Sequence, residues 1–277
     1  MPFSVFAIVL FAAALHAGWN AAVKLGSDKT AASILVAASA AAIAAAVLPF
    51  LSLPQAPSWP FIAASALIHV AYFLLVGRAY HAGDMGQTYP LMRGTAPLVV
   101  AFVGTLFLGE PLTEGGAVGI FLICFGVLGM ALGSRRGQAR GIAYALVNAL
   151  VIASYTLVDG LGVRNSGAPA AYTLWVFLLT GLPLGAYMAV RSRGAFKDQT
   201  VATLWRPLLG GAASLLSYSL VLWAMTQASI PLVAALRETA ILFGAAISIL
   251  VFKENARPIR MAAACMIAAG ATAMRVK

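Results

Sequence analysis

The chain has 277 residues, of which 62% are hydrophobic and only 9% are charged, and its formal net charge is +10. Because an ordinary soluble domain has roughly 25% charged residues, the 18 basic and 8 acidic residues are too few to cover a water-exposed surface. A soluble fold is therefore excluded. Since each membrane-spanning helix needs about 20 apolar residues, about ten helices would occupy most of the chain and leave no room for a soluble catalytic domain.

Long apolar runs, separated by glycine, proline and charged residues, predict the individual membrane-spanning helices. In chain order they are expected at 3–24, 30–53, 59–81, 84–108, 113–133, 140–162, 169–190, 207–227, 229–252 and 258–275. The first run has no basic residue before it and is longer than the apolar part of a signal peptide, so we interpret it as a retained helix. The sequence therefore predicts an all-α integral membrane protein with ten transmembrane helices.

The lysine and arginine residues lie mainly on one side of these predicted helices. Thirteen of the eighteen are in, or next to, the connectors that follow the odd-numbered helices: Lys24, Lys29, Arg78, Arg135, Arg136, Arg140, Arg191, Arg193, Lys197, Arg206, Lys253, Arg257 and Arg260. The opposite side has only Arg164, Arg275 and Lys277. By the positive-inside rule, the odd-numbered connectors are cytoplasmic and both termini are periplasmic in a multi-pass inner-membrane protein. The positive net charge therefore indicates membrane topology and not a nucleic-acid partner.

Two basic residues, Arg93 and Arg237, remain inside predicted helices and reveal an internal repeat. A shift of 144 residues (237 minus 93) aligns them and also aligns Glu110 with Glu254. Because a repeat of five spans crosses the membrane an odd number of times, the second copy enters it upside down. We therefore expect two inverted five-helix repeats, residues 1–134 and 135–277, which form one structural unit around a central cavity. Inverted repeats of this kind are typical of secondary transporters, whose substrate site lies near the midplane.

Five short segments carry a resemblance to a known family. They are His16-Ala-Gly-Trp-Asn20, Tyr89-Pro-Leu-Met-Arg93-Gly-Thr-Ala-Pro97, Leu108-Gly-Glu110-Pro-Leu-Thr113, Leu236-Arg-Glu-Thr239 and Phe252-Lys-Glu254. Together they resemble the EamA-type, ten-helix branch of the drug/metabolite transporter superfamily, and the whole chain is similar to the YddG-like amino acid exporters within it. The resemblance implies alternating access around a central cavity and the export or exchange of small metabolites, with aromatic and other neutral amino acids as the leading substrates.

Polar side chains inside the bilayer are costly, so each one is a candidate for the substrate site. In the first span, His16, Asn20 and Lys24 recur every four residues and share one helical face, which is expected to face the bundle. Trp19 lies beside this face. Trp19 and Asn20 are therefore candidates for substrate binding and His16 for gating or coupling, whereas Lys24 is expected at the membrane interface. The alternative for His16 and Asn20 is hydrogen bonding to neighbouring helices.

The third and fourth spans supply four further candidates for substrate binding. His69 and Tyr72, near the middle of the third span, suit an aromatic slot for a side chain, with packing as the alternative for His69. Arg93 follows Tyr89 by one turn, and its guanidinium fork suits a carboxylate. The alternative is that Arg93 and its repeat partner Arg237 pair with acids and lock the fold or a gate.

Two prolines flank Arg93 in the fourth span, Pro90 and Pro97. Because proline removes a helical hydrogen bond and crowds the preceding turn, we expect both to break or loosen this helix. Irregular backbone at membrane depth is tolerated where it lines a cavity. The fourth span is therefore predicted to be irregular on both sides of Arg93.

The second half of the chain supplies the remaining candidates. Those for substrate binding are Tyr155, Tyr218, Trp223 and Arg237. Asp159 and Glu238 are the acids predicted within the hydrocarbon region, and either would be the titrating group of a proton-coupled transporter. Glu110 and Glu254 are turn residues that the inverted repeat puts at opposite membrane faces, where they are expected to cap helices or contribute to gates.

Two other classes of protein remain as alternatives. An integral membrane enzyme acting on lipids or polyprenyl carriers would need a metal or phosphate site, but the sequence has no HExxH motif, no DxxD cluster and no CxxC pair around Cys124 or Cys265. A passive channel would favour a ring of like groups along a pore. We expect no enzyme activity, no metal and no cofactor. The expected partners are a small-molecule substrate and the lipid bilayer, and the two fused halves make a monomer sufficient.

Overall fold

The computed structural model describes residues 1–24, 29–132, 139–191, 205–251, 253 and 258–275, and within them it contains helices and no strand. The α-helices are α1 (Phe3–Lys24), α2 (Lys29–Val47), α3 (Trp59–Ala82), α4 (Met85–Phe107), α5 (Glu114–Leu132), α6 (Ala139–Arg164), α7 (Pro169–Arg191), α9 (Trp205–Gln227), α10 (Ile230–Arg237), α11 (Ala240–Leu250) and α12 (Pro258–Ala273). Two 3-10 turns, η1 (Leu48–Phe50) and η2 (Ala56–Ser58), lie between α2 and α3. The predicted all-α membrane fold is confirmed.

Each predicted span coincides with a helix, or in one case with two consecutive helices. Among the described residues, eight spans are long and apolar enough to cross a membrane, and two shorter apolar helices at 35–50 and 258–273 correspond to the second and tenth predicted spans. The second span is shorter than predicted because α2 gives way to η1 at Pro49, which lacks a backbone N–H.

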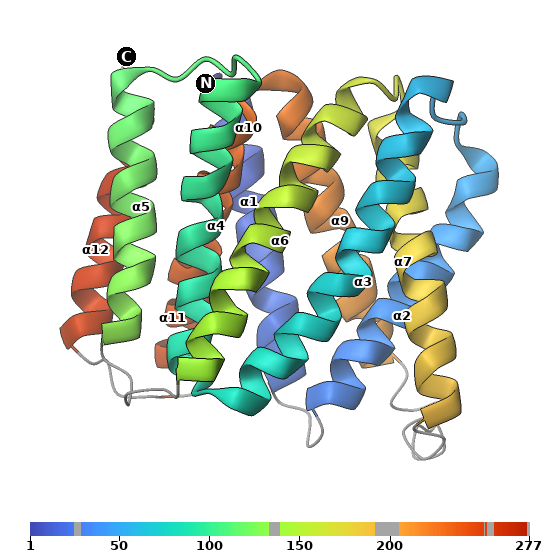
Figure 1. Ribbon diagram of the computed structural model, residues 1–277, viewed down its shortest axis with the longest axis horizontal. Helices are drawn as coiled ribbons and strands as arrows, with labels where there is room; N and C mark the ends of the chain where they lie inside the picture. The colour runs from blue at the N-terminus through green and yellow to red at the C-terminus, as the bar shows by residue number, and fades with distance from the viewer. Residues whose placement is uncertain (25–28, 133–138, 192–204, 252, 254–257, 276–277) are drawn as a thin grey trace.

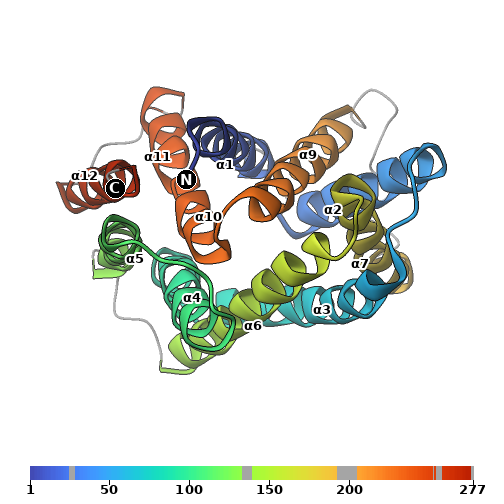
Figure 2. The ribbon, with the colours of Figure 1, turned by 90° about the horizontal axis from the view of Figure 1, so that it is seen from above.

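The helices form two rows that face each other (Figure 2). One row contains α4, α6 and α3, and the other contains α11, α10, α1 and α9. Helices α5 and α12 pair at one end of the rows, and α2 and α7 pair at the other. Both termini lie at the same end of the molecule (Figure 1), where the Arg275 guanidinium donates to the Met1 carbonyl oxygen at 3.1 Å.

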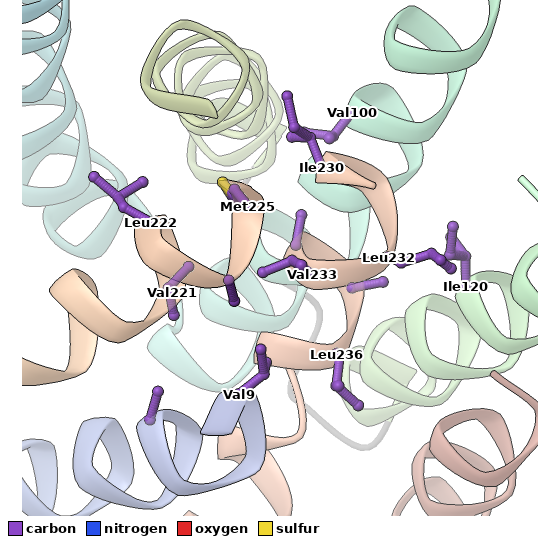
Figure 3. Close-up of a cluster of buried hydrophobic side chains, with 14 of the residues drawn as sticks. Val9, Val100, Ile120, Val221, Leu222, Met225, Ile230, Leu232, Val233 and Leu236 are labelled. Atoms are coloured by element: carbon purple, nitrogen blue, oxygen red, sulfur yellow. The ribbon is translucent and has the colours of Figure 1, made fainter. Parts of the chain in front are cut away.

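The short helix α10 is the centre of the hydrophobic core. All eight of its residues are buried, whereas in α11 only Ala240 is buried. Figure 3 shows Val9 of α1, Val100 of α4 and Ile120 of α5 around it, together with a group of side chains from α9. A helix that is covered on all sides belongs to the interior of a protein. The fold therefore holds the end of α10, where Arg237 lies, between the two rows.

The ninth predicted span is not one continuous helix, because it is interrupted between α10 and α11. At the break, the backbone N–H groups of Glu238 and Thr239 donate to Ala235 and Leu236, each three residues back and each at 3.0 Å. The Thr239 hydroxyl also donates to the Leu236 carbonyl at 2.7 Å. Such local hydrogen bonds compete with the helical ladder. The hydropathy pattern could not reveal this break because apolar residues continue on both sides of it.

The expected irregularity of the fourth span is wrong. Helix α4 continues from Met85 to Phe107 with both Pro90 and Pro97 inside it. Both prolines are buried, and α5, α6 and α10 pack against the helix. In membrane proteins, neighbouring helices can hold a helix together across a proline. In this protein the packing outweighs the lost hydrogen bonds, and the ninth predicted span is interrupted instead of the fourth.

Candidate functional site

Ten of the predicted site residues gather between the two rows of helices, and we call them the central polar cluster. They are His16 on α1, His69 and Tyr72 on α3, Tyr89 and Arg93 on α4, Tyr155 and Asp159 on α6, Tyr218 on α9, Arg237 on α10, and Glu238 directly after α10. Hydrogen bonds, ring contacts and electrostatic interactions link them to one another. The cluster contains residues from both halves of the chain, so neither half could form it alone.

Arg93 and Glu238 form a buried ion pair that connects α4 to the break between α10 and α11. The Nε atom of Arg93 donates to Oε2 of Glu238 at 2.8 Å, and the two side chains are only 6% and 5% exposed. Another nitrogen of the same guanidinium, Nη2, is buried without a hydrogen-bond partner among the described residues. Because a buried donor left unpaired is costly, Arg93 is suited to bind a further acceptor such as a carboxylate oxygen.

Arg237 carries a second buried positive charge in the cluster. Its Cζ atom lies 5.5 Å from the centre of the Tyr218 ring, and within the described part of the chain its guanidinium forms no ion pair. Glu238 pairs with Arg93, and the other acid of the cluster, Asp159, accepts from Tyr172 and Tyr218, so neither acid forms an ion pair with Arg237. A buried charge requires a compensating partner. The arrangement therefore favours the binding of an anionic group next to Arg237.

Asp159 is a fully buried acid whose two oxygens are both occupied. Tyr172 of α7 donates from its hydroxyl to Oδ1 at 3.0 Å, and Tyr218 donates to Oδ2 at 2.6 Å. Tyr172 is not among the residues predicted from the sequence. Nothing in the spacing of an apolar span marks one tyrosine as the partner of an acid on another helix, so only the fold could identify it.

Four rings form a continuous aromatic wall along α3, α6 and α9, made of His69, Tyr72, Tyr155 and Tyr218. His69 stacks on Tyr155 with ring centres 4.2 Å apart and an interplanar angle of 28°. Tyr72 meets the same tyrosine edge to face at 5.8 Å, and Tyr218 meets His69 at 6.0 Å. Rings in contact at these distances attract one another and present apolar faces. The wall is suited to the side chain of an aromatic or apolar ligand.

A small cavity lies beside Arg237 and Glu238, between α4, α6 and α10. Its other lining residues are Ala96, Pro97 and Val100 of α4, Ile152 and Thr156 of α6, and Ala234 of α10. Most of these side chains are small and apolar, and the charged groups of Arg237 and Glu238 complete the lining. The cavity therefore provides space next to the charged groups without supplying another charge.

Four of the described site residues lie outside the central polar cluster, namely Trp19, Asn20, Trp223 and Glu110. Trp19 contacts His16 edge to face at 5.3 Å, with its indole N–H buried and without a partner among the described residues. Asn20 is exposed and donates to the His16 carbonyl at 2.7 Å, so this part of the predicted polar face does not turn toward the bundle. Trp223 packs against the apolar core around α10. Glu254 lies outside the described residues.

Glu110 belongs to a separate network, which we call the Glu110 clasp. Both of its oxygens accept from the Arg164 guanidinium, and Oε2 also accepts from the Ile230 backbone N–H at 3.0 Å. Arg164 in addition donates to the carbonyl oxygens of Met225 and Ala228, at 2.7 and 2.9 Å. The clasp thus ties the turn after α4 to the end of α6 and to the turn between α9 and α10. The turns that it joins lie at the end of the molecule that holds both termini (Figure 1).

Comparisons with known proteins agree with this architecture. Residues 139–276 match the EamA-like transporter family. A solved structure titled "Crystal structure of protein" aligns with 99% of this chain and 96% of its own, with a TM-score of 0.78 and 15% sequence identity, which establishes a common fold. A search of curated proteins gave no significant match.

Proposed function

We propose a function from the premise that residues 139–276 belong to the EamA-like transporter family of the drug/metabolite transporter superfamily. This multi-pass membrane transporter exports or exchanges small metabolites by alternating access. Its substrate class would be aromatic and other neutral amino acids, as in the YddG-like exporters that the sequence resembles. The inner membrane would be its location, and a single chain would suffice because both halves contribute to one central cluster.

One observation carries the choice of substrate: two buried guanidinium groups adjoin an aromatic wall. The substrate carboxylate would bind the free Nη2 of Arg93 and the guanidinium of Arg237. The substrate side chain would lie on the rings of Tyr72 and Tyr155, with His69 and Tyr218 completing the wall. Tyr89, one turn from Arg93 and within its electrostatic range, would close the same space.

Glu238 is the group that we propose for coupling. A substrate carboxylate that binds Arg93 competes with Glu238 for the same guanidinium, and the released Glu238 would either take up a proton or bind the substrate ammonium. Because Glu238 lies at the break between α10 and α11, its release would also remove the ion pair that connects α4 to this break. Among the candidates for gating, His16 faces the two arginines, and the Glu110 clasp would close one end. Glu254 remains the proposed counterpart at the other end.

The helix contacts support the division into repeats 1–134 and 135–277. Helix α3 packs on α6 as α9 packs on α1, and α4 packs on α6 as α11 packs on α1. The last helices of the two proposed repeats, α5 and α12, pair with each other, as do the second helices, α2 and α7. This is the pattern of contacts expected from two copies of one five-helix unit related by a twofold axis.

Counterflow in proteoliposomes is the experiment that tests the proposed function. We expect labelled phenylalanine or leucine to enter vesicles faster when unlabelled amino acid is present inside, with saturation, because a carrier reorients faster when loaded. The amide of the same amino acid, which lacks the carboxylate, should not exchange. Vesicles without protein provide the control. Flux that does not saturate would indicate a channel, and the absence of flux for every amino acid would contradict the proposed substrate class.

The predicted topology leads to a second test. Arg135 and Arg136, which lie outside the described residues, are expected in the cytoplasm. A single cysteine at either position should therefore resist a membrane-impermeant reagent added to intact cells and react after the cells are opened. A cysteine in the turn at 165–168 is the matched control and should react from outside. The opposite labelling pattern would reverse the proposed orientation.

A further inference from the structure

We propose that Asp159 is a positioning residue for Arg237 and acts on it through Tyr218. In this arrangement Asp159 fixes the Tyr218 hydroxyl, the Tyr218 ring holds the Arg237 guanidinium, and Arg237 is thereby aimed at the carboxylate of the substrate. The inference rests on the proposed function for the identity of that carboxylate. The link from Asp159 through Tyr218 to Arg237 is supported independently by the contacts among these three side chains.

The carboxylate of Asp159 is held rigidly on both sides. Tyr172 donates to one oxygen at 3.0 Å and Tyr218 to the other at 2.6 Å, from α7 and α9 respectively. Ser65 and His69 lie beside the same carboxylate. Since an ionised carboxylate only accepts hydrogen bonds, two hydroxyl donors satisfy it well without a cation. Asp159 is therefore better suited to orient its two tyrosines than to change hydrogen-bond partners during transport.

The position of Tyr172 depends on a glycine. A Cβ atom at Gly162 would lie 2.3 Å from the Tyr172 hydroxyl oxygen and 2.5 Å from the Phe61 Cβ atom, so any side chain at Gly162 would displace the tyrosine. Glycine at this position leaves the space that Tyr172 needs to reach Asp159. Gly162 on α6 and Tyr172 on α7 thus act together to hold one carboxylate oxygen of Asp159.

At its other end, Tyr218 is the contact that holds Arg237. The Arg237 Cζ lies 5.5 Å from the ring centre, and the same ring meets His69 at 6.0 Å and Phe177 at 5.9 Å. A cation is attracted only when it lies over the ring face, so the orientation of Tyr218 determines where the guanidinium rests. Arg237 forms no ion pair among the described residues. If the Tyr218 ring rotated, no ion pair would therefore fix the position of the Arg237 guanidinium.

A double-mutant cycle on the full-length transporter in proteoliposomes tests the functional side of the inference. We expect Asp159→Asn to raise the KM for the amino acid about tenfold while the maximal rate changes little, a coupling of ordinary size for residues linked through a shared partner. In an Arg237→Gln background the same substitution should change KM by less than about twofold, because the residue through which it acts is already absent. Additive losses in the double variant would overturn the inference.

A spectroscopic measurement tests the same inference without any substrate. In protein labelled with ¹⁵N-arginine, the side-chain resonance of Arg237, assigned with Arg237→Lys, should be shifted by the ring current of Tyr218. Asp159→Asn, or Tyr172→Phe if the first variant does not fold, should move it toward the position of an ordinary arginine. Tyr144→Phe, beside Arg140 at 6.0 Å, is the matched control and should leave it unchanged.

The two measurements separate the inference from the proposed function. If the wild-type protein exchanges no amino acid, the proposed substrate class fails, and the resonance of Arg237 still decides whether Asp159 positions it. An Arg237 resonance that does not move in folded Asp159→Asn or Tyr172→Phe protein overturns the positioning role, even if amino acids are exchanged normally.

Discussion

Replacing Arg93 with alanine is expected to abolish counterflow and to destabilise the protein by about 3–5 kcal/mol, the usual effect of removing one partner of a buried ion pair. The cause is Glu238, whose side chain is only 5% exposed and would remain as an uncompensated charge. The loss of transport has a second cause, because the substrate carboxylate would lose the free Nη2 of the same guanidinium. Thermal unfolding of the purified protein and counterflow in proteoliposomes measure the two effects separately.

A paired variant distinguishes a ligand from a lock. In Arg93→Ala/Glu238→Ala, no charge is left unpaired at this contact, so most of the lost stability should return. If Arg93 binds the substrate, counterflow remains absent in this variant. If its role is only to lock α4 to the break after α10, removing both partners should allow transport, with altered rates. Normal counterflow by the single variant Arg93→Ala would exclude both roles.

The ten spans could be predicted because membrane insertion depends on quantities that are local in sequence. A run of about 20 apolar residues has to be helical in lipid, where no water can satisfy the backbone. Two of the differences from the predicted spans arose where helix packing or local hydrogen bonding, and not composition, decides the outcome. Pro90 and Pro97 are accommodated within α4 because three neighbouring helices pack against it, whereas α10 ends at Arg237, where Glu238 and Thr239 form local hydrogen bonds that hydropathy does not register.

The sequence was sufficient to predict which residues form the candidate site, but not which of them contact one another. Arg93, Arg237 and Glu238 attract attention because a charge inside an apolar span is exceptional. Their partners lie far away in sequence, as Arg93 and Glu238 are 145 positions apart. A tyrosine such as Tyr172 is unremarkable in a membrane helix until its hydroxyl is seen to reach Asp159. Pairings of this kind depend on the folded arrangement of all the helices.

Replacing Glu110 with alanine is expected to open the end of the molecule that we propose the Glu110 clasp closes. Glu110 is buried and accepts hydrogen bonds from Arg164 and from the backbone of Ile230. A hydrogen bond to a charged group contributes about 1.5–3 kcal/mol, and we take the lower figure for the clasp as a whole because the Arg164 side chain is 33% exposed and partly screened by water. As about 1.4 kcal/mol corresponds to a factor of ten in an equilibrium, the closed population should fall about tenfold relative to the open one.

A cysteine reporter measures this shift directly. Ala234 lines the small cavity beside Arg237 and is only 6% exposed, so Ala234→Cys, with Cys124 and Cys265 replaced by alanine, should react slowly with a maleimide in the closed state. Adding Glu110→Ala should raise its labelling rate about tenfold, because labelling requires the open state. Glu114→Ala removes an exposed acid from the start of α5 and is the matched control. Equal labelling rates in the Glu110 and Glu114 variants would show that the clasp stabilises the fold without controlling access to the central polar cluster.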